Sequence, residues 1–241
     1  MVQIPEPARE RLLHIVRILE TASGSGKTFT SGELETLTGW PSHTIRKDIS
    51  YLGNDTEGAD AAPGGERGAG YAPGRLIPRI KEALGLTRRR KFCVVGLGRL
   101  GSAYLNLDAA LLDEFELAAG FDINVNRVEI LKSPAPLYPA HKMGEVIGRL
   151  GIEIALLCVP SEQAQAAAEK CAAAGIRGIV NFAPRVLVLP PGPGGGPVIV
   201  RNVFVAGELR ALAVKIENGP QVPAPELPRA SGFLGTRPHC E

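Results

Sequence analysis

The feature that most constrains the fold is a glycine-rich run in the middle of the chain. Residues 96–101 read Gly-Leu-Gly-Arg-Leu-Gly, which satisfies the GxGxxG pattern, and an apolar run at 92–96 leads into it. In this pattern Gly96 allows a tight turn, Gly98 lets a pyrophosphate approach the backbone, and Gly101 lets the following helix pack close to the strand. The run therefore predicts a strand–turn–helix unit that binds a dinucleotide.

The second half of the chain alternates strands and helices. Strands are expected at residues 92–96, 116–122, 152–160, 176–182, 186–189 and 198–205. Helices are expected at 100–112, 161–174 and 206–217, and a further helix ends at 147–150. This alternation is typical of a mostly parallel sheet with helices on both faces. We predict an α/β fold, with a Rossmann-type doubly wound domain at residues 87–217, a separate domain at 1–86, and a disordered Pro- and Gly-rich tail at 218–241.

An acidic residue favours NAD(H) as the ligand of the glycine-rich loop. Asp122 ends the next expected strand, about 20 residues after Gly101, where a carboxylate can accept hydrogen bonds from ribose hydroxyls. An acid there disfavours a 2′-phosphate, although Arg127 a few residues on could help to bind one. The alternative is a Rossmann-type fold with a vestigial site. The pattern assigns cofactor binding to Gly96, Leu97, Gly98, Arg99, Leu100, Gly101 and Asp122.

Residues for catalysis by a nicotinamide enzyme are missing. Such an enzyme needs an acid or base to handle the substrate proton. Of the four histidines only His141 lies in the second half before the tail, in a Pro-rich connector. No further domain large enough to hold a substrate follows. We therefore predict that the chain is not an enzyme, with no catalytic residue and no metal site.

Composition narrows the setting of the protein. No apolar stretch approaches the roughly 18 residues that span a bilayer, so we expect no membrane segment. The four cysteines show no CxxC spacing, which favours a reduced, cytoplasmic protein. The formal net charge is only +2, so contact with nucleic acid would depend on a local patch of basic residues.

The first half of the chain offers such a patch. Short helices are expected at 6–21, 30–37 and 42–52, and the second and third are joined by a Gly-containing turn, as in a helix-turn-helix. Glu35 stands where this motif usually has a small residue. Because Ile45, Ile49 and Leu52 face inward, the other face of the third helix can reach a major groove and its phosphates. The predicted DNA-binding residues here are Ser42, His43, Thr44, Arg46, Lys47 and Ser50. The alternative is a solvated charged face on a small accessory bundle.

Several stretches together resemble the Rex family of redox-sensing transcriptional repressors. They are Ile45–Gly53, Arg67–Tyr71, Val94–Gly101, Val159-Pro160, Gly178–Pro184 and Arg201–Val203, and the match runs from about residue 5 to 217. The resemblance implies a homodimer in which a winged-helix domain binds operator DNA and a Rossmann domain senses the NADH/NAD⁺ ratio. It also implies that the C-terminal helix, here 206–217, swaps between subunits.

The resemblance adds site residues and marks departures. It adds Tyr51 and Arg67 to the DNA-binding set, and it adds Val159, Pro160, Phe182 and Pro184 to the cofactor-binding set. The expected wing between Gly53 and Gly70 is longer than in the family and acidic. Leu107 and Phe204 stand where the family commonly has Tyr and Asp, which belong to the network that distinguishes oxidised from reduced cofactor. Redox discrimination is therefore expected to be weakened or built differently.

Two other functions remain open at this point. One is an NAD(P)-dependent oxidoreductase whose N-terminal helices serve oligomerisation. The other is a Rossmann-type protein that binds CoA or a nucleotide without affinity for DNA. The second of these leaves the basic face at Arg46 and Lys47 unexplained, whereas the first would show itself by steady consumption of NADH with carbonyl substrates.

Overall fold

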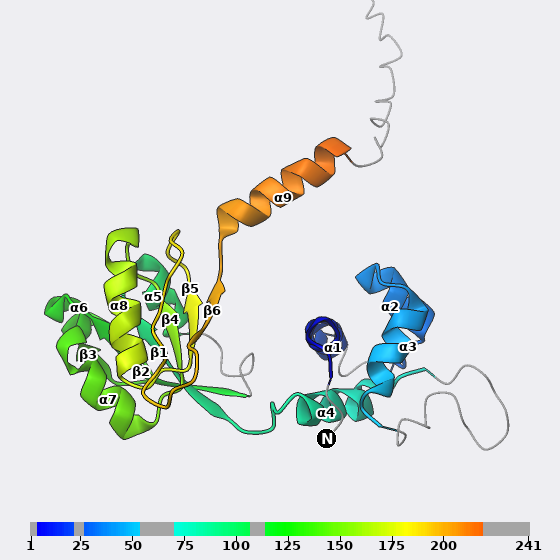
Figure 1. Cartoon of the computed structure of the whole chain (residues 1–241), viewed down its shortest axis with the longest axis horizontal. Coiled ribbons are helices and arrows are strands. Elements are labelled where there is room, and N and C mark those ends of the chain that lie inside the picture. Colours follow the sequence, from blue (N-terminus) through cyan, green and yellow to red (C-terminus); the bar gives the residue numbers. More distant parts are fainter. Residues whose placement is uncertain (1–3, 22–26, 54–69, 107–113, 219–241) are drawn as a thin grey trace, which may run out of the picture.

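The computed structural model describes residues 4–21, 27–53, 70–106 and 114–218, which form two units side by side (Figure 1). The N-terminal unit consists of helices α1–α4, and the sheet unit contains a six-stranded sheet with its covering helices. Most of the expected wing, including Arg67, lies outside the described residues, as do Leu107 and residues 219–241.

The N-terminal unit is built from α1 (Glu6–Thr21), α2 (Ser31–Thr38), α3 (Ser42–Ser50) and α4 (Pro73–Ala83) around one apolar core. The fully buried side chains of this core are Leu12, Ile15, Leu19, Leu34, Ile45 and Ile80. Leu13 on α1 is apolar but 45% exposed, whereas Ile15 faces the core. At 3.6 residues per turn, positions 12, 15, 16 and 19 share one face and position 13 does not.

Helices α2 and α3 are joined by the expected glycine-containing turn. Helix α2 opens with a capping box between Thr30 and Glu33 and ends at Gly39, whose φ of 74° is in the left-handed region. The unusual Glu35 has a local task, because its Oε2 accepts a hydrogen bond from the backbone N–H of Ser42 at 3.0 Å. The acid therefore satisfies a free N–H at the start of α3.

A pair of backbone hydrogen bonds ties the chain just before α4 to the connection between α1 and α2. Phe29 and Tyr71 form an antiparallel bridge, with N···O distances of 2.9 and 2.6 Å. The guanidinium of Arg79 on α4 donates to the carbonyl of Leu52 at 3.1 Å, just beyond α3. These contacts fix the base of the expected wing against α1–α4.

The sheet confirms the predicted α/β class. Its strands are β1 (Arg90–Val95), β2 (Phe115–Asp122), β3 (Leu137–Pro139), β4 (Ile154–Leu157), β5 (Gly178–Asn181) and β6 (Ile199–Asn202). All neighbours pair in parallel in the order β3-β2-β1-β4-β5-β6, which is the order of the dinucleotide-binding fold. Along β1, Cys93 and Val95 face one core while Phe92 and Val94 face the other, so both sides of the sheet are covered.

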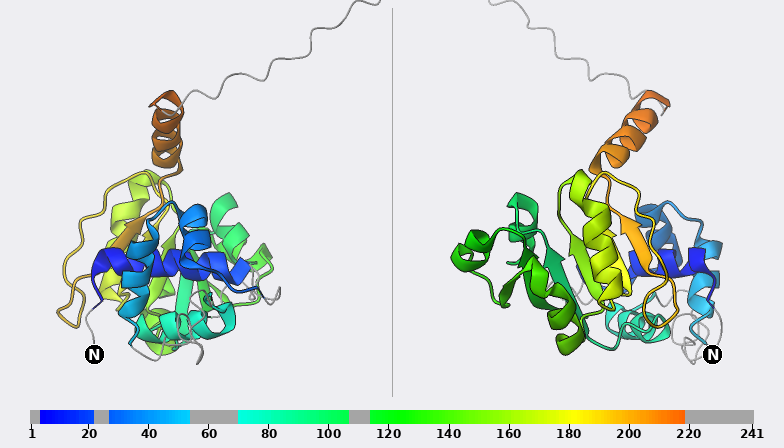
Figure 2. Two further views of the ribbon diagram at one scale, coloured as in Figure 1. Left: turned by 90° about the vertical axis from the view of Figure 1, so that its right-hand side faces the viewer. Right: turned by 60° about the vertical axis from the view of Figure 1, so that its left-hand side comes forward.

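Helices cover the two faces unequally. They are α5 (Arg99–Tyr104), α6 (Val125–Ile130), the 3₁₀ turn η3 (Ala140–Lys142), α7 (Met143–Leu150), α8 (Ser161–Ala173) and α9 (Val205–Asn218). Helices α7 and α8 pack on one face, and the end of α5 with Leu105 packs on the other (Figure 2). No helix within the described ranges is both long enough and apolar enough to cross a membrane.

Two sequence-based expectations failed in this unit. Residues 186–189 form no strand. The backbone of Val188 instead exchanges two hydrogen bonds with the side chain of Gln165 on α8. The short α6 and β3 were not predicted, because six and three residues leave too little periodicity to recognise.

Helix α9 projects from the sheet and has no buried residue (Figure 1). Its apolar side chains at positions 205, 209, 212 and 216 recur at helical spacing, and each is at least 54% exposed. Asn218, which was expected to belong to the tail, is its last residue.

Ion pairs join the two units. Lys81 on α4 contacts Glu114, just before β2, at 2.5 Å. Arg201 on β6 contacts Glu10 on α1 at 2.8 Å.

Candidate functional site

A cleft of about 840 Å³ opens at the carboxyl ends of β1, β2 and β4. This is where the strand order reverses, the usual ligand crevice of open α/β sheets. Among the predicted cofactor-binding residues, Gly96, Gly98, Asp122, Val159 and Pro160 line it. A cleft of this size is within the range of small-molecule and cofactor sites.

The three glycines of the loop have different tasks. Gly96 has φ of 90°, and a Cβ there would lie 2.7 Å from the carbonyl oxygen of Cys158. A Cβ on Gly101 would lie 1.8 Å from the carbonyl oxygen of Gly96, so the loop and α5 can pack this closely only without a side chain. A Cβ on Gly98 would meet no atom within 4 Å, although Gly98 lines the cleft. Gly98 thus leaves open the surface that a phosphate needs.

Asp122 connects the loop to the cleft. Its carboxylate is buried, with Oδ2 accepting from the N–H of Leu97 at 2.6 Å and Oδ1 accepting from the N–H of Asn124 at 2.7 Å. The guanidinium of Arg127 lies 3.4 Å from Oδ2 and also lines the cleft. The residue predicted to accept ribose hydroxyls therefore also holds the glycine-rich loop in place.

The remaining predicted cofactor residues lie around the cleft without lining it. Leu97 and Gly101 are buried under the loop, while Arg99 and Leu100 are exposed on the first turn of α5. Phe182 follows β5 and packs on Tyr104, with ring centroids 5.1 Å apart. Pro184 is exposed in the same turn.

Sequence reasoning missed a buried amide that shapes this turn. Asn181 is fully buried at the end of β5, and its two Nδ2 hydrogens are shared among three acceptors at 2.8–3.1 Å: the carbonyls of Ala183 and Arg185, and Oδ1 of Asn202 on β6. Its Oδ1 accepts from the N–H of Ala183 at 3.0 Å. A polar residue ending an apolar strand was the available signal.

One wall of the cleft was also missed. Gln163, Ala166, Ala167 and Lys170 on α8 line it, at the spacing of one helical face, and Met143 on α7 lines it from another side. The small residues of the Ala-rich run after Pro160 could have indicated a wall that a ligand approaches closely.

Cys158 is part of the cleft lining. Burial raises the pKa of its thiol to about 11. A protonated thiol is a poor nucleophile, so Cys158 reacts slowly at neutral pH.

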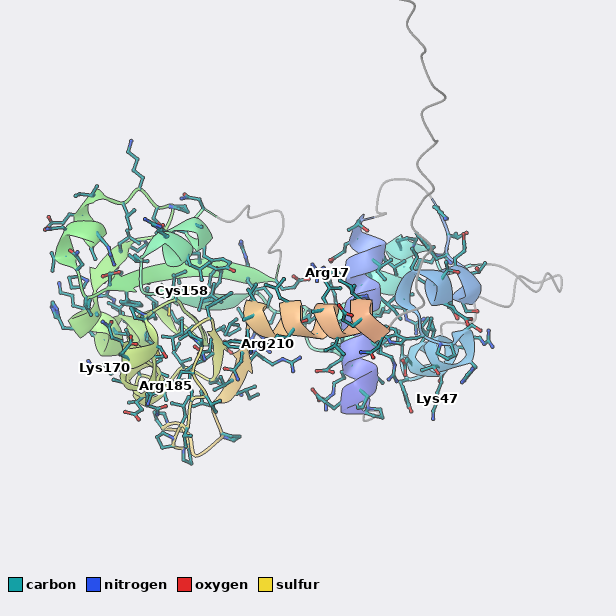
Figure 3. All side chains as sticks on the ribbon, turned by 90° about the horizontal axis from the view of Figure 1, so that it is seen from above. Arg17, Lys47, Cys158, Lys170, Arg185 and Arg210 are labelled. Atoms are coloured by element: carbon teal, nitrogen blue, oxygen red, sulfur yellow. The ribbon has the colours of Figure 1, made fainter. Side chains whose placement is uncertain are left out.

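The structure gathers the predicted DNA-binding residues of α3 on one outer face. His43, Arg46, Lys47 and Ser50 are exposed, Ser42 and Thr44 are partly exposed, and Tyr51 packs partly on the core. Figure 3 shows Lys47 on the outer side of the N-terminal unit, beyond α1 from the sheet. Arg46 donates a hydrogen bond to Oγ of Ser31 at 2.9 Å, so its guanidinium lies over the start of α2.

A buried ion pair fixes this helix, and sequence reasoning missed it. Asp48 on α3, only 1% exposed, accepts two hydrogen bonds from Arg11 on α1, at 2.6 and 2.8 Å. The hydrogen bond to Asp48 raises the pKa of the Arg11 guanidinium. The signal was a carboxylate on the inward stripe of Ile45 and Ile49, where it needs a partner.

Comparisons with known proteins agree with both halves of this arrangement. Residues 87–185 match the family model described as "CoA binding domain", and residues 3–50 match "Putative DNA-binding protein N-terminus". The redox-sensing transcriptional repressor Rex of Thermus thermophilus is 39% identical over 215 residues, covering 87% of this chain and 92% of the relative. The chain belongs to the Rex family. The Rex protein of Levilactobacillus brevis is 31% identical over 217 residues, covering 90% and 96%.

Solved Rex structures extend this result to the fold. RSP, a Rex-family repressor, matches with a TM-score of 0.73 and 27% identity, over 90% of this chain and 96% of that one. RSP has also been solved with β-NADH, and with β-NAD⁺ and operator DNA, each at a TM-score of 0.73 and 26% identity. The resemblance stated from the sequence is confirmed. Because Rex proteins are regulators, the repressor interpretation is favoured over an oxidoreductase.

Proposed function

We propose that this protein represses transcription as a homodimer whose affinity for operator DNA depends on NADH or NAD⁺ bound in the cleft. The observation that carries the proposal is the pairing, in one Rex-family chain, of an open phosphate cradle at Gly98 with the exposed basic face of α3. RSP, solved with both kinds of ligand, has the same architecture over nine-tenths of this chain.

In the cleft, this chain's residues bind and orient the dinucleotide. The backbone at Gly98 faces the phosphates, Asp122 lies at the ribose end of the loop, and Val159 with Pro160 forms the opposite side. We place Phe182 and Pro184 on the nicotinamide side, because their turn follows β5 at the same edge of the sheet. The bound dinucleotide supplies the redox state that the protein senses.

On the DNA side, α3 enters the major groove. His43, Thr44, Arg46, Lys47 and Ser50 form its groove-facing surface, and we include Ser42, Tyr51 and Arg67 as further DNA contacts. Two such helices in a symmetric dimer read two half-sites about one helical turn apart. A tenfold change in operator affinity on NADH binding needs only about 1.4 kcal/mol of coupling between the sites.

The exposed apolar stripe of α9 supports the homodimer. Val205, Leu209, Leu212 and Ile216 lie at least half exposed on a helix that contacts no core cluster of the described chain. Apolar surface arranged this way marks a protein interface, and a second copy can cover the same stripe on each subunit. We propose that α9 exchanges between the two subunits.

Operator selection from random duplexes, followed by binding assays without ligand, with NADH and with NAD⁺, tests this function. We expect a two-fold symmetric site, strong salt dependence of binding, and different affinities in the presence of the two dinucleotides. Light scattering should give the mass of a dimer. Absence of specific duplex binding, together with steady oxidation of NADH on a panel of carbonyl compounds, would instead support the oxidoreductase alternative.

A further inference from the structure

We propose that the ion pair between Arg201 and Glu10 transmits the state of the dinucleotide site to the DNA-binding helices. The inference rests on the proposed function and assigns its regulation to named side chains. Glu10 lies on α1 of the N-terminal unit and Arg201 on β6 of the sheet unit, with 2.8 Å between Nη2 and Oε1. In Figures 1 and 2, β6 is the strand of the sheet nearest to α1.

The position of the pair makes it sensitive to movement between the units. The chain passes from one unit to the other between α4 and β1, and the Lys81–Glu114 pair lies near that connection. A pivot there leaves Lys81 and Glu114 close together. Arg201 and Glu10 are far apart in sequence and meet away from the connection, so a rotation of the units about it separates them first.

On the ligand side, β6 is tied to the turn that follows β5. The residue next to Arg201 is Asn202, whose Oδ1 accepts a hydrogen bond from the buried Asn181 at 2.9 Å. Asn181 also holds the carbonyls of Ala183 and Arg185 and so fixes the turn that contains Phe182. A shift of this turn on dinucleotide binding must either move Asn202 or break hydrogen bonds of the buried Asn181 amide, and leaving a buried amide unpaired is costly.

On the DNA side, the residue next to Glu10 is Arg11, which holds α3 through the two hydrogen bonds to Asp48. A displacement of α1 at Glu10 therefore acts one residue away from Arg11, which holds the recognition helix α3 in place. The links at the two ends are buried or partly buried, whereas Arg201 and Glu10 have side chains 71% and 51% exposed. The weakest link is thus the one that crosses between the units, as a reversible contact should be.

The ion pair stabilises whichever arrangement of the dimer contains it. A regulatory role can therefore be distinguished from a purely local stabilising role. If operator and NADH prefer different arrangements, loss of the pair must change the two affinities in opposite directions. We expect Glu10→Gln and Arg201→Gln each to do so, with the larger change about twofold to fivefold, the usual effect of an exposed ion pair. The charge exchange Glu10→Arg with Arg201→Glu should restore both affinities.

The experiment uses the full-length dimer, a duplex obtained by selection with the parent protein, and NADH itself. Operator affinity is measured without dinucleotide by fluorescence anisotropy, and NADH affinity without DNA by its own fluorescence. Glu6→Gln is the matched control, because Glu6 forms an exposed ion pair with Arg9 at 2.9 Å within the same helix. The control should leave both affinities unchanged.

Opposed changes in the single variants, reversed by the charge exchange, support the proposal. Unchanged affinities in Glu10→Gln and Arg201→Gln overturn it, and so does parallel weakening of both, which would indicate a loss of stability. If the parent protein itself binds NADH and operator with no influence of one on the other, the proposed function fails along with the inference. If NADH changes the operator affinity of the parent protein but the single variants keep the parent's affinities, only the inference is refuted.

Discussion

Replacing Gly98 and Gly101 by alanine, one at a time, should separate ligand binding from folding in the glycine-rich loop. Gly98 has φ of −68°, which alanine adopts readily, and its added methyl would meet no protein atom within 4 Å. The methyl on Gly101 would lie 1.8 Å from a backbone oxygen of the same loop. The two substitutions add the same group at neighbouring points with opposite surroundings.

The magnitudes follow from these surroundings. Overpacking at Gly101 should cost about 3 kcal/mol, the upper end for an added methyl because backbone must move, and this lowers Tm by about 6–12 °C. Alanine at position 98 stabilises the apoprotein slightly, by about 0.4–1 kcal/mol, since it restricts the unfolded chain. The same methyl keeps the phosphates off the backbone and removes charge-assisted hydrogen bonds worth about 1.5–3 kcal/mol, a loss of roughly 10- to 100-fold in NADH affinity.

Thermal unfolding of the apoprotein, NADH fluorescence titration and operator binding without dinucleotide together test this reasoning. Gly98→Ala should melt at or above the parent Tm, bind operator as the parent does, and lose NADH. An alanine at position 98 that still binds NADH within threefold of the parent would show that phosphates do not approach there. A Gly101→Ala protein with the parent Tm would show that the loop has room that the geometry denies it.

Three further outcomes are expected. Arg11→Ala should lower the free energy of unfolding, measured in urea, by about 3 kcal/mol. Asp48→Ala should lower it less, because only the Arg11 variant leaves a buried carboxylate unpaired. Equal losses in the two variants would contradict this. Arg46→Ala should weaken operator binding and reduce its salt slope by about one, whereas Arg149→Ala on α7 should change neither, as a salt titration would reveal. Iodoacetamide should label Cys158 at pH 8 about a thousandfold more slowly than it labels a fully ionised thiol, because only the thiolate reacts. The labelling rate, followed by peptide mass spectrometry, should rise toward pH 11. Rapid labelling at pH 8 would refute the burial of Cys158.

Local patterns were sufficient for the parts of this fold that repeat at short range. The GxGxxG run predicted the order strand, turn and helix, although the helix was expected to reach residue 112 and α5 ends at Tyr104. The inward stripe of Ile45 and Ile49 predicted the buried face of α3. Elements shorter than two periods of their own pattern, such as α6 with six residues and β3 with three, left no recognisable pattern. At 186–189 a β-type composition predicted a strand that the structure does not contain, because the backbone of Val188 bonds to the side chain of Gln165 and not to a neighbouring strand.

The candidate site could be predicted from the sequence at positions that only one type of residue can occupy. Gly96 and Gly101 follow from the close packing that the motif requires. The Arg11–Asp48 and Arg201–Glu10 pairs join residues distant in sequence, so they depend on how helices and strands pack after the chain has folded. The local sequence around a charged residue in a polar stretch does not predict which residue will be its ion-pair partner.

The double engagement of Asp122 limits how the dinucleotide preference of this protein can be redesigned. A change from NAD(H) to NADP(H) is commonly sought by removing the acid beside the ribose. Here both carboxylate oxygens accept backbone N–H groups, one of them from Leu97 in the phosphate loop. Substitution by a small neutral residue would leave these donors without acceptors and loosen the loop that any dinucleotide needs, so new selectivity at this position has to be introduced together with a replacement acceptor for Leu97.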